Sequence, residues 1–165
     1  MRGGKGAFLG CYFNDAGINP MHDEFFAPMG PEARVILETA RKEAPDAVVF
    51  LFGGASRAGL MRPAYTPTTV QQRVADLATV LSERLESARI PASGVPGVAA
   101  ESRDPPAPFN LISATYHTCG AMCFGFMGPH GLSSSDGEAP TVAPEQILDS
   151  HLLLFETLFE SLLTP

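Results

Sequence analysis

The feature that most constrains the fold of this 165-residue chain is an uninterrupted apolar run at residues 47–52, Ala-Val-Val-Phe-Leu-Phe, closed by Gly53 and Gly54. A short run rich in β-branched and aromatic residues, without polar alternation, is typical of a strand that is covered on both faces. Such strands belong to parallel-type sheets with helices packed on either side. The run therefore predicts a central strand of an α/β fold.

The rest of the chain predicts the other layers of that fold. In residues 69–88, apolar side chains such as Val74, Leu77 and Leu81 recur at steps of three and four, which is the helical period. Thr68 with Gln71, or Thr69 with Gln72, could form a capping box there. Similar patterns predict helices at 31–43 and from Pro144 onward, the latter packing by one face, and strands at 7–13, 109–116 and 121–127.

Strands that alternate with helices predict a three-layer α/β/α fold with a mostly parallel or mixed central sheet. The length of 165 residues favours a single domain spanning residues 1–165. The proline-rich segment 91–108 and the turn-rich segment 128–140 are expected to be loops.

Charge and composition exclude several classes of function. The net charge is −7, with 11 basic and 18 acidic residues and no basic cluster, so nucleic acid is not an expected partner. The longest apolar runs are far shorter than a membrane span requires, so no membrane association is expected. Three cysteines (Cys11, Cys119 and Cys123) and the lack of an apolar leader predict reduced thiols and a cytoplasmic location.

Histidines gather where a ligand site is expected. Ligands of open α/β sheets bind at the carboxyl ends of the strands, and three of the four histidines lie in segments predicted to follow strands. They are His22, followed by Asp23, and then His117 and His130. His151 lies within the last predicted helix and is expected to be structural.

One local pattern could hold a metal ion. His117, Cys119, Cys123 and His130 supply two imidazoles and two thiols, which are ligands that zinc accepts. The spacing is not the usual paired form, and the alternative is two small buried thiols beside two histidines with separate hydrogen-bond partners.

Several segments together resemble a known family. Residues 12–23 (YFNDAGINPMHD), 48–54, 109–120, 124–132 and 145–149, in this order, resemble the C-terminal half of zinc carboxypeptidase-like metallopeptidases of the carboxypeptidase A type. The resemblance implies a mixed sheet flanked by helices. It also implies an incomplete sheet with an exposed edge, because the family's early His-x-x-Glu zinc motif does not occur in this chain.

The resemblance places the family's functional positions on residues of different chemistry. The third zinc ligand of the family, a histidine, falls at Phe52, and the general-base glutamate falls at Met127. The pair that receives a substrate carboxylate falls at Met21 and His22, which leaves His22 as a weaker carboxylate partner. The resemblance thus implies zinc in the parent family and no bound metal here, with His22, Asp23, Phe52, His117, Met127 and His130 around the pocket.

Three hypotheses follow for the function. In the favoured one, the chain is a truncated or degenerate relative of an enzyme whose reaction is metal-assisted hydrolysis of a peptide or related amide bond. An active enzyme would have to rebuild its zinc site from other residues. The alternative is a metal-independent α/β domain that binds a peptide, a carboxylate-bearing molecule, a second copy of itself or a missing N-terminal half.

Overall fold

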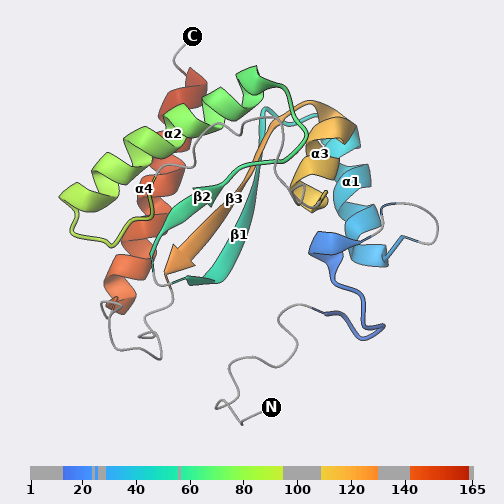
Figure 1. Cartoon of the computed structure of the whole chain (residues 1–165), viewed down its shortest axis with the longest axis horizontal. Coiled ribbons are helices and arrows are strands. Elements are labelled where there is room, and N and C mark those ends of the chain that lie inside the picture. Colours follow the sequence, from blue (N-terminus) through green and yellow to red (C-terminus); the bar gives the residue numbers. More distant parts are fainter. Residues whose placement is uncertain are drawn as a thin grey trace, which may run out of the picture.

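A computed structural model describes residues 13–23, 25, 29–55, 57–94, 109–129 and 142–163. A small sheet lies between two pairs of helices, α1 with α3 on one side and α2 with α4 on the other (Figure 1). The expected α/β architecture is therefore confirmed. In chain order, the elements are η1 (Pro20–His22), α1 (Pro31–Glu43), β1 (Ala47–Ala55), β2 (Gly59–Met61), α2 (Thr68–Ser87), α3 (Leu111–Cys119), β3 (Met122–Pro129) and α4 (Pro144–Leu163).

The sheet is mixed and has the order β1-β3-β2. β1 runs parallel to β3, from the pair Ala47 with Met122 to the pair Phe52 with Met127, and β2 is antiparallel to β3. Alternate residues of β1 face opposite layers: Val48, Phe50 and Phe52 pack on the side of α3, whereas Ala47 and Val49 pack on the side of α2 and α4. The predicted apolar strand is thus confirmed, with a hydrophobic cluster on each face. Its predicted central place is wrong, because among the described strands β3 lies in the middle of the sheet and β1 at the edge. An apolar run shows that both faces of a strand are packed, but it does not show whether both edges are paired.

The two predicted helices around β1 and β2 are present. α1 begins with Pro31 at its first position and ends at Ala44, which has a left-handed backbone and precedes Pro45. α2 starts at Thr68, but neither predicted capping box forms, because Pro67 is the capping residue and makes no side-chain hydrogen bond. The side chain of Gln71 donates instead to the carbonyl of Thr66, at 2.9 Å.

The prediction of a strand at residues 109–116 is wrong, because residues 111–119 form α3. The β-branched and aromatic residues of this segment favoured a strand, but a capping residue at each end favours the helix. The Oδ1 atom of Asn110 accepts a hydrogen bond from the backbone N–H of Ser113, and Gly120 takes the left-handed conformation (φ 73°) that ends the helix. β3 follows as the predicted strand at 121–127.

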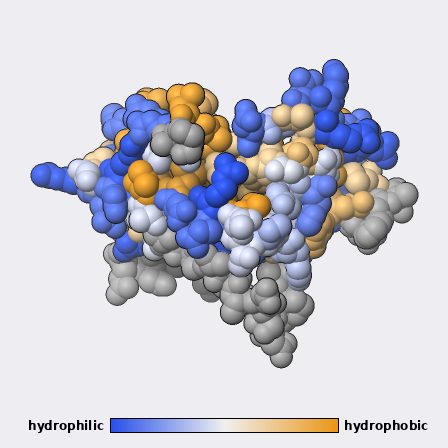
Figure 2. Space-filling model, turned by 90° about the horizontal axis from the view of Figure 1, so that it is seen from above, coloured by the Kyte–Doolittle hydropathy of each residue, from blue (hydrophilic) through white to orange (hydrophobic). Residues whose placement is uncertain are grey.

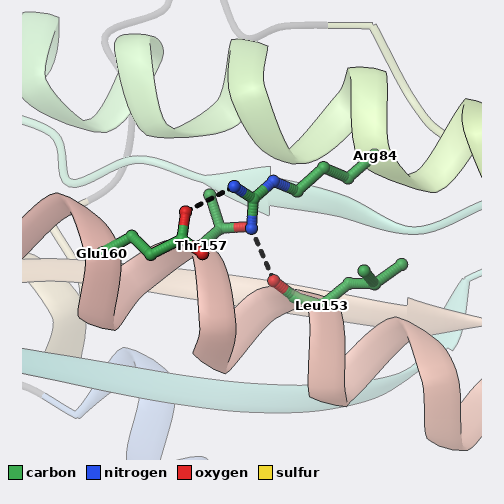
Figure 3. A network of polar contacts seen from close by, with 4 residues as sticks. All are labelled: Arg84, Leu153, Thr157 and Glu160. Carbon is green, nitrogen blue, oxygen red and sulfur yellow. Dashed lines mark hydrogen bonds and ion pairs between the residues drawn. The ribbon is translucent and has the colours of Figure 1, made fainter.

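α4 is present as predicted, but its apolar residues do not all pack on one face. The buried residues of α4 are Ser150, Leu154, Thr157 and Leu158. α4 is joined to α2 by an ion pair between Arg84 and Glu160, next to a hydrogen bond from the Thr157 hydroxyl to the Leu153 carbonyl (Figure 3). Leu148 and Phe159, which were expected to pack, are exposed.

The remaining predicted segments lie largely outside the described residues. This holds for residues 7–12 of the first predicted strand and for most of both predicted loops, and Phe13 is not part of a strand. Within the described part of the chain, no helix is long and apolar enough to cross a membrane.

Candidate functional site

The carboxyl ends of β1 and β3 bring two of the predicted site residues together. Phe52 and Met127 are partners in the parallel ladder, and both are half-buried. The Phe52 ring lies over Gly125 of β3: a Cβ atom at that glycine would stand 2.8 Å from Cε2 of Phe52 and 3.1 Å from Cδ1 of Ile112. This end of the sheet is therefore filled with apolar groups on the side of α3.

His22 is the last residue of the short helix η1, and Asp23 comes directly after it. η1 packs against α3, with Met21 in the hydrophobic cluster of that layer, and the His22 side chain is exposed. Asp23 is buried, and its Oδ2 atom accepts a hydrogen bond from the backbone N–H of Gly30 at 2.7 Å. Because Gly30 caps the amino end of α1, the carboxylate anchors this loop where the helix dipole favours negative charge.

His117 was predicted to follow the carboxyl end of a strand, but its segment forms the helix α3. It occupies the last turn of α3, and β3 begins only three residues after that helix ends, so His117 lies near the amino end of β3. The Nε2–H group of its exposed ring donates a hydrogen bond to the Tyr65 carbonyl at 2.9 Å, and the ring stacks on Phe109 with the centroids 5.9 Å apart. Phe52 and Met127 pair at the opposite end of the strands.

The two cysteines of the predicted metal pattern lie on different elements. Cys119 ends α3, where its thiol donates to the Thr115 carbonyl, and Cys123 is fully buried in β3. Burial, with the charge and the hydrogen bond of the Cys119 thiol, raises the pKa of Cys123 to about 12. Zinc binding at Cys123 would have to displace a proton from a fully buried thiol.

The described residues do not fit the zinc ion that the family resemblance implies. Among them, no group of three or more His, Cys, Asp or Glu side chains could hold a metal ion. At the two implied positions, the phenyl ring of Phe52 has no lone pair to donate, and the thioether of Met127 is not a base. His130 lies outside the described residues, so the four-residue pattern around His117 stays a prediction.

An aromatic group around His117 was not predicted. Phe109 contacts the rings of Phe25, Tyr65 and His117, with centroids 5.7 to 6.2 Å apart. Phe25 and Tyr65 both have positive φ values of 57°, which non-glycine residues seldom adopt. The spacing of these residues along the chain gives no signal, because only the tertiary fold brings them together.

Comparisons with protein families, with curated proteins and with solved structures found no match.

Proposed function

We propose that this chain is a catalytically silent relative of the zinc carboxypeptidase-like metallopeptidases and binds a peptide or a small carboxylate without a metal ion. The parent reaction would be metal-assisted hydrolysis of a peptide or related amide bond.

The observation that carries this proposal is the pairing of Phe52 with Met127. By resemblance, these positions correspond to a zinc ligand and to the general base, and they are cross-strand neighbours at the carboxyl ends of β1 and β3. Two groups that act on one water molecule would need this kind of proximity. The observed side chains fill the same place with apolar atoms.

The chemistry of the substitutions favours loss of catalysis over a changed rate. Hydrolysis of this type needs a metal ion that acidifies water and polarises the carbonyl, and a nearby carboxylate that moves the proton. Phe52 and Met127 supply neither. Zinc would provide the Lewis acid in the parent family, and the described residues of this chain offer it no ligand set.

His22 is the residue best suited to hold a carboxylate. Its side chain is exposed, and its loop is held by Asn19, whose side chain caps η1, and by the buried Asp23. The imidazole can donate a hydrogen bond in either tautomer and carries a charge when protonated. A free carboxylate should therefore bind better than a neutral amide.

The test is a calorimetric titration of the full chain with N-acetyl-glycyl-phenylalanine and with its C-terminal amide, each in EDTA and in added zinc. We expect the carboxylate form to bind better, equally well in both buffers, and to remain intact. The variant H22Q should lose the preference for the carboxylate, whereas H117Q, near the other end of β3, should keep it. Hydrolysis that EDTA abolishes, or the absence of binding by both forms, would contradict the proposal.

A further inference from the structure

β1 has a long free edge in the described part of the chain. It pairs only with β3, along Ala47 to Phe52, and no other strand of the described residues lies on its second side. The free edge carries backbone N–H and C=O groups in the spacing that a further strand would pair with. Edge strands this long and apolar are normally shortened, charged or covered, because they template pairing with another chain.

An apolar groove runs beside this edge on the side of α4. It has a volume of about 430 Å³. Its floor is formed by Ala47, Val49 and Leu51 of β1, and its wall by Phe155, Leu158, Phe159 and Leu162 of α4. Leu51 is 50% exposed although it belongs to the central apolar run of the chain. The helices on this side pack on β3 and β2 and leave the outer part of β1 open.

α4 extends the groove with a second apolar stripe. Leu148, Leu152, Phe155, Phe159 and Leu162 recur at steps of four and three, which places them along one side of a helix. Phe159 is 58% exposed and Leu148 is 61% exposed, so the stripe is distinct from the buried face around Leu154. Figure 2 shows hydrophobic surface, in orange, gathered over the end of the molecule that α2 and α4 occupy.

Acidic residues border the apolar surface. Glu145, Asp149, Glu156 and Glu160 recur along α4 at positions i, i+4, i+11 and i+15, next to the stripe, and Asp46 lies in the groove. Residues 144–163 contain no lysine or arginine, and Arg84 of α2 pairs with Glu160. The border is therefore predominantly negative.

From the free edge, the groove and the acidic border together, we infer that this face binds a basic polypeptide segment, which adds a β-strand to β1 and places apolar side chains against α4. Backbone hydrogen bonds to β1 would supply affinity. Alternate apolar side chains would enter the groove beside Leu51 and Phe159, and flanking Lys or Arg side chains would meet the acidic border.

Two observations favour this partner over a second copy of the chain. A second copy would bring the same acidic row to the interface, and the chain has a net charge of −7, so the two copies would repel. A basic segment would instead be attracted to the acidic row, and its backbone could form hydrogen bonds with the free edge of β1. The inference does not depend on the proposed ligand site, because Phe52 and His22 lie on the α3 side of the sheet.

The test uses the full chain and the labelled peptide Lys-Val-Thr-Val-Thr-Val-Lys as the probe. Binding is measured by fluorescence anisotropy, and amide exchange of residues 47–55 is measured by mass spectrometry. We expect binding that weakens as salt is added and slower exchange in β1. The variants L51K and F159K should each weaken binding about tenfold or more. V35K, which changes an equally exposed residue of α1 in the opposite layer, should bind as the parent chain does.

Control peptides make each part of the inference testable. A peptide with glutamate ends should bind less well, and a peptide with alternate N-methylated amides should not bind, because it cannot pair along β1. The inference is overturned by failure of the lysine peptide to bind, by equal binding of either control peptide, or by unchanged binding to L51K and F159K. It is also overturned if the parent chain forms dimers in solution and L51K does not, or if the peptide binds only after residues 1–12 are removed. Those results would assign the face to a second copy or to the chain's own N-terminal segment.

Discussion

The ring of Phe52 occupies the space that a side chain at position 125 would need. A Cβ atom on Gly125 would lie 2.8 Å from Cε2 of Phe52 and 3.3 Å from Cβ of Met61. G125A should therefore reduce the free energy of unfolding by about 1–3 kcal/mol, as measured by urea denaturation. The double variant F52L/G125A should recover part of that loss, because leucine withdraws the ring atoms. Equal stability of G125A and the parent chain would show that the ring does not fill this space.

Asn110 is the residue that starts α3. Its Oδ1 atom accepts hydrogen bonds from both the backbone N–H and the hydroxyl of Ser113, at 3.1 and 3.2 Å. N110A should cost about 1–2 kcal/mol in the free energy of unfolding, because a buried helix loses its cap. N110S keeps a capping oxygen and should lose less. Equal losses in the two variants would mean that the cap does not stabilise the helix.

The same cap explains which part of the fold the sequence could predict. α1, β1, α2 and α4 each have a strong periodic or apolar pattern, and the structure confirms them. Residues 111–116 have strand-like composition, but they form a helix that starts at the Asn110 side-chain cap and ends at the left-handed backbone of Gly120. Composition averages over a window, so it gives little weight to one hydrogen bond at each end.

The candidate site could be predicted only in part, for a related reason. The family resemblance placed Phe52 and Met127 around one pocket, and the two residues are ladder partners in β1 and β3. His117 was placed at that end on the assumption that its segment is a strand, and the helix moves it toward the other end. In α4, apolar residues at helical spacing predicted one packed face, but the spacing cannot tell a covered stripe from an open one.

The pKa of Cys123 makes stability depend on pH. Burial raises this pKa from 9.0 to about 12, so the folded state holds the thiol proton more tightly than the unfolded state does. The stabilisation is complete below pH 9 and is lost as the pH rises from 9 toward 12. C123A lacks this thiol, so only the parent chain should lose this stabilisation between pH 9 and 12. The difference in unfolding free energy between the parent chain and C123A should therefore shrink across this range. A constant difference between the two proteins from pH 7 to 12 would contradict this assignment.

The central proposal is that this chain binds its ligand without a metal ion. The most direct measurement is zinc per chain, by elemental analysis of the full protein after refolding in excess zinc and exhaustive dialysis. We predict no retained zinc, because Phe52 and Met127 offer no ligand and the described residues bring no three potential ligand side chains together. About one tightly held zinc per chain, lost on C119S or H117A, would contradict the account and would assign a metal site to the pattern around His117.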